Sequence, residues 1–262
     1  MAKNPTPIIS LTTDFGEQDG YVGIMRGVIL TICPDATLID LTHAIAPQNL
    51  PAAAFVLYQS FDYFPPHTVH CVVVDPGVGS QRRAVAIRTG GGIFVGPDNG
   101  VFSLVLNSGL NVLEAVTLTN PRYQLKNVSH TFHGRDIFAP AAAHIAAGIP
   151  LPELGSPATN LVPLESAASP TADQCQVIHI DRFGNLFLNL TASQVTAPDK
   201  IVFTIGDQEV RRLHNTFADV DEGQAVAYVG STKQHVEIAV RNGNAADRFS
   251  LKVGDTIRIS NR

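Results

Sequence analysis

The chain has 262 residues, of which 45% are hydrophobic and 16% are charged, with a formal net charge of −5. This length allows one large domain or two modest ones, each able to bury a core. The negative charge balance argues against a protein that binds a nucleic-acid backbone. No stretch reaches the roughly 18 apolar residues of a membrane span, and the first residues lack the pattern of a signal peptide. We therefore expect a soluble, cytoplasmic protein.

The first 150 residues alternate short β-rich runs with helix-like segments. Thr68–Asp75 is almost continuously apolar, as in a central strand, and the glycines 90–92 between two short apolar runs indicate a hairpin. Gly148 stands where a helix C-cap is expected. The other expected strands are Pro7–Thr13 and Thr37–Thr42, and the expected helices are Tyr21–Ile32, Pro51–Phe61, Asn99–Leu106 and Pro140–Ala147. Repeated βα units predict an α/β N-terminal domain, residues 1–150, with a largely parallel sheet.

The pattern changes after residue 150. Residues 151–172 are dense in Pro, Ser and Ala and have no sustained periodicity, which is typical of a linker. Residues 173–262 contain six short β-rich runs with no convincing helix between them, and they predict a small all-β, barrel-like or sandwich domain. These runs are Cys175–Asp181, Leu186–Leu190, Lys200–Ile205, Ala225–Val229, His235–Val240 and Asp255–Ile259.

Common catalytic signatures are absent, and four polar, glycine-rich loops stand out instead. The sequence has no P-loop, no GxGxxG after a strand, no GxSxG, no HExxH and no CxxC. The first loop places Asp14 after the first strand, at the sheet edge where α/β proteins bind ligands, so its carboxylate could pair with a ribose diol. Asp14 could equally be a helix N-cap or a turn residue.

The second loop runs from Asp75, which ends the most hydrophobic strand, through two glycines to Arg82. Seven residues are enough for the loop to fold the guanidinium back onto the carboxylate, and the competing interpretation is a structural ion pair that closes a turn. The third loop contains His133 beside a glycine at a helix entrance, which makes it the best general-base candidate. His130 lies three residues before it, but no third ligand is evident, so we expect no metal site.

The fourth loop contains Asp181, Phe183 and Asn185 in the first hairpin of the β domain. Asp181 could bind an ammonium group, Phe183 could stack on a base and Asn185 could form a hydrogen bond with it. A plain β-turn explains the same residues.

The order of these motifs is more specific than any one of them. TTDFG, VDPGVGSxRR, TFHGRD, IDxFGN and GNAA occur in this order, and together they resemble the S-adenosylmethionine hydroxide adenosyltransferase family over nearly the whole chain. That family is homologous to fluorinating and chlorinating enzymes that attack the same substrate with halide. The resemblance implies a trimer in which substrate lies between the N-terminal domain of one subunit and the C-terminal domain of its neighbour, with no cofactor and no metal.

The resemblance also implies roles for individual residues. The hydroxide-positioning triad falls on Asp75, Arg82 and His133, and the expected reaction is hydrolysis of S-adenosylmethionine to adenosine and methionine. The substrate-binding residues that the resemblance implies are Asp14 for the ribose, Asp181 for the methionine amino group, Phe183 and Asn185 around the adenine, Ser231 near the methionine carboxylate, and Asn244 and Ala245 close to the adenine. After Ser231 the sequence departs from the family, which usually has a glycine and then an aromatic or apolar residue there.

Two alternatives can be weighed on the same residues. The halogenases carry a tyrosine where Asp75 stands, lose the histidine at position 133 and use a serine where Gly134 lies. A carboxylate at the reaction centre would repel a halide, so the sequence favours water as the nucleophile. A silent S-adenosylmethionine or adenosine sensor would keep Asp14 and Asn185 but would not need the other three groups.

Overall fold

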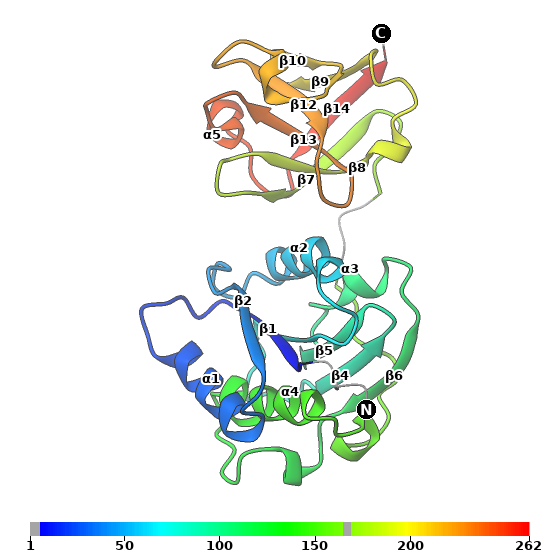
Figure 1. Cartoon of the computed structure of the whole chain (residues 1–262). Helices are drawn as coiled ribbons and strands as arrows, with labels where there is room; N and C mark the ends of the chain where they lie inside the picture. Colours follow the sequence, from blue (N-terminus) through cyan, green and yellow to red (C-terminus); the bar gives the residue numbers. More distant parts are fainter. Residues whose placement is uncertain (1–5, 165–168, 262) are drawn as a thin grey trace. The chain divides into compact units, whose positions relative to one another are not determined.

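The computed structural model describes residues 6–164 and 169–261, which form two compact units (Figure 1). The N-terminal unit is built on a six-stranded sheet in the order β2-β1-β3-β5-β4-β6. β2, β1, β3 and β5 are parallel, and β4 and β6 are antiparallel to their neighbours. The strands are β1 (Ile8–Thr13), β2 (Thr37–Thr42), β3 (Val69–Val73), β4 (Ala84–Thr89), β5 (Gly92–Pro97) and β6 (Val112–Thr117).

Helices cover both faces of this sheet. α1 (Tyr21–Ile32) and α4 (Ala139–Ala146) lie side by side and share one apolar core with the strands, whereas α2 (Leu50–Ser60) and α3 (Ser103–Leu106) belong to the core on the opposite face (Figure 1). Val69, Cys71 and Val73 of β3 belong to one core and Val72 to the other, and all five residues of the strand are buried, as expected for a central strand. The predicted α/β unit with a largely parallel sheet is confirmed.

Several local predictions can be compared with this unit. β4 and β5 form the expected hairpin, and Gly148, in a left-handed conformation with φ +98°, ends α4 as expected. The helix predicted over Asn99–Leu106 is wrong in its first half, because residues 99–102 form a bend and a turn and only Ser103–Leu106 is helical. β6 was not predicted, since two of its residues, Val112 and Leu113, are exposed at the sheet edge and leave no alternating pattern.

Residues 151–164, part of the expected linker, are hydrogen-bonded to the N-terminal unit. Arg83 donates to the carbonyl oxygens of Thr159 and Asn160 at 2.8 and 2.7 Å. The Asp98 carboxylate accepts from the backbone of residue 162, and the hydroxyl of Ser103 accepts from that of residue 164. The first part of the segment is therefore fixed on this unit, and residues 165–168 lie outside the described ranges.

The C-terminal unit is an eight-stranded sheet in the order β10-β9-β14-β7-β8-β13-β12-β11, and β10 approaches β12 so that the sheet nearly closes on itself. Neighbouring strands are antiparallel except for the short β11–β12 pair. The predicted barrel-like unit is confirmed. Its strands are β7 (Gln174–Ile180), β8 (Leu186–Thr191), β9 (Ile201–Ile205), β10 (Gln208–Arg211), β11 (Leu213–His214), β12 (Ala225–Val229), β13 (His235–Val240) and β14 (Thr256–Asn261).

The expectation that no helix separates the C-terminal strands is wrong at one place. α5 (Ala245–Phe249) follows β13, and the side chain of Asn244 caps it by accepting from the backbone nitrogen of Asp247 at 2.9 Å. Five residues are too few to show a helical hydrophobic period, and this is why the sequence pattern does not reveal the helix.

Candidate active site

A charged cluster lies at the end of β3. Asp75 follows this strand, and the loop returns Arg82 to it just before β4. The Nε atom of Arg82 donates to both Asp75 oxygens at 3.0 and 2.9 Å, and Nη2 donates to Oδ2 at 2.5 Å. The side chain of Asp75 is only 6% exposed and that of Arg82 only 10% exposed. Such a buried bidentate pair fixes the carboxylate in one orientation, and losing one partner would leave an unpaired buried charge.

The loop that carries this pair needs its second glycine. Gly79 adopts φ +79°, and a Cβ atom placed on it would lie 2.8 Å from the carbonyl oxygen of His130. A side chain here would thus be strained by the backbone and would push away the segment 129–133. Close approach of the two loops is what brings His133 to Arg82.

His133 completes the cluster. Its Nδ1 atom accepts from Nη2 of Arg82 at 2.7 Å, so in the neutral ring the proton lies on Nε2. Burial lowers the pKa of His133, and the positive charge of Arg82 lowers it further, while Asp75 and a hydrogen bond with the backbone of Ser129 oppose the shift. The structure therefore favours a neutral imidazole that accepts a hydrogen bond from the guanidinium.

Asp136, which the sequence analysis did not single out, fixes the His133 loop. It is completely buried, and its Oδ2 atom accepts from the backbone nitrogen and the hydroxyl of Ser129 at 2.8 and 2.7 Å. Arg135 pairs with the same carboxylate, and the hydroxyl of Ser129 accepts from the backbone of Phe132. The carboxylate three residues after the histidine could have drawn attention, but only the fold shows that it faces Ser129.

A pocket of about 330 Å³ opens beside this cluster. Asp75 and His133 both line it, whereas Arg82 is not among its lining residues and lies behind them. Asp14 is on the wall, where its Oδ2 atom accepts from the backbone nitrogen of Gln48 at 2.7 Å. The edge-to-face rings of Phe15, Tyr21 and Phe132 form an apolar wall, with ring centroids 5.3–5.9 Å apart. The pocket therefore joins a buried carboxylate and an imidazole to an apolar surface.

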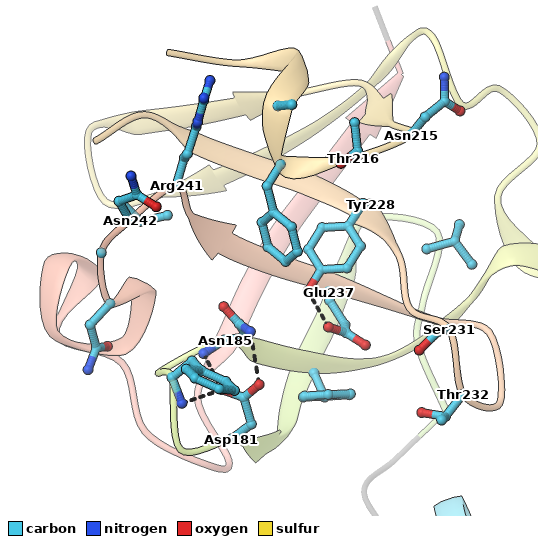
Figure 2. Close-up of a pocket in the computed structure, with 18 residues that line it drawn as sticks. Asp181, Asn185, Asn215, Thr216, Tyr228, Ser231, Thr232, Glu237, Arg241 and Asn242 are labelled. Carbon is cyan, nitrogen blue, oxygen red and sulfur yellow. Dashed lines mark hydrogen bonds between the residues drawn. The ribbon is translucent and has the colours of Figure 1, made fainter. Parts of the chain in front are cut away.

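The C-terminal unit contains a second, wider pocket of about 1180 Å³ (Figure 2). Asp181 and Asn185 belong to one tight turn, in which Asp181 accepts from the backbone of Phe183 and Asn185 and from the side-chain amide of Asn185, at 2.8–2.9 Å. Phe183 is 75% exposed and lines the pocket. An exposed ring at the tip of a rigid turn is available for stacking on a planar ligand.

Of the other three expected binding residues, two line the C-terminal pocket and one does not. Ser231 is exposed and lines the C-terminal pocket, as does Asn244. Asn244 also packs against Gly184, where a Cβ atom would lie within 1.9 Å of its Oδ1 atom. The side chain of Ala245 is fully buried in the core of this unit and does not line the pocket.

Tyr228 and Glu237, which sequence reasoning missed, lie in the middle of the C-terminal pocket. The tyrosine hydroxyl donates to Oε2 of Glu237, and Figure 2 shows the pair between the Asp181–Asn185 turn and the segment that carries Thr216. Burial raises the pKa of Glu237, and nearby Asp181 raises it further, whereas the tyrosine opposes the shift. The run HVEIAV has a regular strand pattern, and no signal in it marks the glutamate as a pocket residue.

Within residues 6–164 and 169–261, no group of three or more His, Cys, Asp and Glu side chains is arranged to hold a metal ion. In the same part of the chain, no helix is long and apolar enough to cross a membrane.

Comparison with known proteins supports one family along the whole chain. Residues 9–155 match the profile of the SAM hydroxide adenosyltransferase N-terminal domain, and residues 175–258 match that of its C-terminal domain. The chain is 42% identical to the (R)-S-adenosyl-L-methionine hydrolase of Salinispora tropica over 98% of both proteins. It is 39% identical to the hydrolase of the same name from Thermus thermophilus, over 94% of this chain and 97% of the relative.

More distant and structural relatives agree with this assignment. A fluorinase of Actinopolyspora mzabensis is 27% identical over 97% of both chains. The crystal structure of a conserved Thermotoga maritima protein superimposes with a TM-score of 0.90 and 37% identity, covering 96% of this chain and all of that one. The profiles match most of both units, and the full-length relatives exceed 30% identity, so the chain belongs to the SAM hydroxide adenosyltransferase family.

Proposed function

We propose that this protein hydrolyses S-adenosylmethionine to adenosine and methionine by in-line attack of water or hydroxide on the 5′ carbon. The observation that carries the proposal is the Asp75–Arg82–His133 cluster, whose carboxylate and imidazole face a pocket. Relatives about 40% identical over their full length are named (R)-S-adenosyl-L-methionine hydrolases, which supports the same substrate here.

The main catalytic requirement of this reaction is the placement of the nucleophile. The oxygen of water bonds to the 5′ carbon while the C–S bond breaks, and the electron pair of that bond stays on sulfur as the neutral thioether of methionine. The leaving group needs neither a proton nor a metal ion, so we propose a metal-independent enzyme without a cofactor. The remaining requirement is an oxygen held in line with the C–S bond, which is a matter of orientation.

We assign a different role to each of the three residues in the cluster. Asp75 lines the pocket and keeps lone pairs beyond those that Arg82 occupies, so it is the group that we assign to orient the water and accept its proton. Nδ1 of His133 is engaged by Arg82, and the lowered pKa keeps the ring neutral, so we assign the imidazole a positioning role. Arg82 holds both groups from behind and places a positive charge near the developing hydroxide.

The substrate-binding roles follow the placement of the pocket residues. We assign Asp14 to the ribose diol, and Phe183 and Asn185 to the adenine, because an exposed ring and a buried amide stand side by side on one turn. Asn244 and the backbone at Ala245 would border the adenine. Asp181, together with the buried carboxyl of Glu237, would receive the methionine amino group, and Ser231 its carboxylate.

The catalytic cluster and the C-terminal pocket each hold only part of what this substrate requires. We therefore propose a homotrimer in which the N-terminal pocket of one chain and the C-terminal pocket of a neighbour form one site. Light scattering should then give three times the chain mass of 28.0 kDa. A monomer with full activity would contradict the shared site.

Two other functions are less well supported. A halide nucleophile would have to approach the carboxylate of Asp75, which lines the pocket and would repel it. A sensor that only binds S-adenosylmethionine has no need for a buried Asp–Arg pair joined to a histidine.

The proposed function is tested by incubating the purified protein with S-adenosylmethionine and separating the products by liquid chromatography. We expect adenosine and methionine in equal amounts, unchanged by a chelator or by added chloride. Formation of 5′-chloroadenosine would identify a halogenase, and binding without turnover would identify a sensor.

The pH dependence of the reaction should report His133. Because its pKa is lowered, the ring stays neutral below the ordinary histidine value of about 6.5, and only further acidification protonates Nδ1 and breaks its bond with Arg82. We expect kcat/KM to be constant through pH 6.5 and to fall at lower pH. In His133→Asn, whose amide does not titrate, this fall should disappear or move, and an identical acid limb in both proteins would contradict the role of His133.

Phe183→Ala should weaken substrate binding without disturbing the fold, because the ring is 75% exposed. Loss of stacking on a base costs about 1–3 kcal/mol, so we expect KM for S-adenosylmethionine to rise roughly 5- to 150-fold with an unchanged melting temperature. Phe217→Leu, a change in a less exposed ring of the same pocket, is the comparison for general apolar loss. An unchanged KM in Phe183→Ala would remove the adenine from this position.

A further inference from the structure

A buried histidine connects the two loops that border the N-terminal pocket. His43 lies between β2 and α2, is 4% exposed, and does not line the pocket. Its ring faces Thr13, the fully buried last residue of β1, which immediately precedes Asp14. The catalytic cluster does not involve either residue.

The hydrogen bonds of His43 have a defined direction. Its Nε2 atom lies 2.9 Å from Oδ1 of Asp40, and a carboxylate can only accept, so Nε2 carries the proton. In the neutral ring Nδ1 is then an acceptor, and the hydroxyl of Thr13 donates to it at 2.9 Å. With its hydrogen committed, the Thr13 oxygen accepts from the backbone nitrogen of Phe15 at 3.2 Å. Arg26 of α1 holds the outer end of this chain through Asp40.

Two further bonds tie the same loops together. The backbone nitrogen of Gly16 donates to the carbonyl oxygen of His43 at 2.8 Å. The backbone nitrogen of Gln48 donates to Oδ2 of Asp14 at 2.7 Å, and Gln48 holds the left-handed conformation with φ +63°. Asp14 is therefore flanked on both sides by residues bonded to the His43–Gln48 loop, and one of its oxygens is already committed.

We propose that the Asp40–His43–Thr13 chain is a positioning device that aims the carboxylate of Asp14 at the substrate's ribose hydroxyls. The inference rests on the proposed function only in taking a nucleoside as the ligand. His43 and Thr13 touch no substrate, and they act by fixing the backbone of residues 13–16, from which Asp14 projects. A loop released at Thr13 would let Asp14 move away from the diol while the Asp75 cluster, held by other contacts, stays in place.

Thr13→Val and Thr13→Ser are a matched pair for testing this device. Valine has nearly the same shape as threonine but has no hydroxyl, whereas serine keeps the donor to His43 and the acceptor for Phe15. Loss of one buried hydrogen bond that orients a ligand group corresponds to about a tenfold change in affinity. The probes are adenosine and 2′,3′-dideoxyadenosine, which lacks the hydroxyls that Asp14 would bind, and binding is measured by titration calorimetry.

We expect Thr13→Val to bind adenosine about tenfold more weakly than the wild type and to bind dideoxyadenosine equally well, with Thr13→Ser close to the wild type for both. Equal weakening of both ligands, or no weakening, would overturn the proposal. If Thr13→Val does not fold, Asp40→Ala is the second variant, at the partly exposed end of the Asp40–His43–Thr13 hydrogen-bonded chain. It should show the same selective loss of adenosine binding to a smaller degree, and an Asp40→Ala protein without this loss would count equally against the device. Selective loss in a protein that does not hydrolyse S-adenosylmethionine would reject the proposed function alone.

Discussion

Replacing Arg82 by alanine is expected to lower kcat for S-adenosylmethionine by roughly 10²–10³-fold, the cost of removing one preorganised electrostatic group from an active site. The guanidinium donates hydrogen bonds to both Asp75 and His133, and both of those groups line the pocket. Without it, a carboxylate that is 6% exposed has lost its charged partner, and the imidazole has lost the donor that orients it. Steady-state kinetics of the purified variant measure the effect.

Two variants make the Arg82 result specific. Arg82→Lys keeps a positive charge, but its single ammonium group cannot reproduce the planar set of donors that contacts both Asp75 and His133. Its kcat should therefore lie between that of Arg82→Ala and that of the wild type. Arg88→Ala is the control: Arg88 lies on β4, where its partly exposed side chain pairs with Glu114 of the neighbouring strand β6. Its loss should leave kcat unchanged. Thermal melting separates loss of fold from loss of catalysis. An Arg82→Ala enzyme that folds and keeps more than about a tenth of the wild-type turnover would contradict the cluster's role.

The shared site predicts that two inactive variants restore activity when they assemble together. Arg82→Ala disrupts the proposed catalytic cluster, and Asn185→Ala removes the proposed contact with the adenine in the C-terminal pocket, so each homotrimer should be nearly inactive at low substrate concentration. In a closed ring of three, any mixed trimer contains one neighbouring pair that offers an intact N-terminal pocket and an intact C-terminal pocket. Mixed trimers should therefore show about one third of the wild-type kcat/KM.

The mixing experiment has a clear control. The two variants carry different tags, are produced together, and are purified through both tags, so that only mixed assemblies remain. The double variant Arg82→Ala/Asn185→Ala, combined with itself in the same way, should stay inactive. Mixed assemblies with no activity would indicate that each site is built within a single chain.

Most of the fold was predictable because its elements show strong local patterns. The buried strand Val69–Val73 is apolar throughout, and the helix Tyr21–Ile32 ends before a proline, so both stand out in the sequence. The edge strand Val112–Thr117 and the five-residue helix Ala245–Phe249 do not, because neither has a buried period long enough to detect. The association of residues 151–164 with the N-terminal unit depends on long-range bonds from Arg83 and Asp98, which no local composition encodes.

Some residues of the candidate site could be predicted from the sequence, and others only from the fold. Asp75, Arg82 and His133 lie in glycine-containing loops, and the order of these loop motifs resembles that of a known family, so the sequence suggested all three residues. The structure brings them into contact. Glu237 lies in a regular strand, and its partner Tyr228 lies in another, so only their pairing across the sheet places them in a pocket.

The most direct test of the account is hydrolysis of S-adenosylmethionine in water enriched in ¹⁸O, followed by mass spectrometry of both products. Attack on the 5′ carbon by a water held at Asp75 predicts one ¹⁸O atom in adenosine, on the 5′ oxygen, and none in methionine. Label in methionine, or adenosine whose 5′ oxygen carries no label, would contradict direct attack of water on this carbon and with it the role assigned to the Asp75–Arg82–His133 cluster.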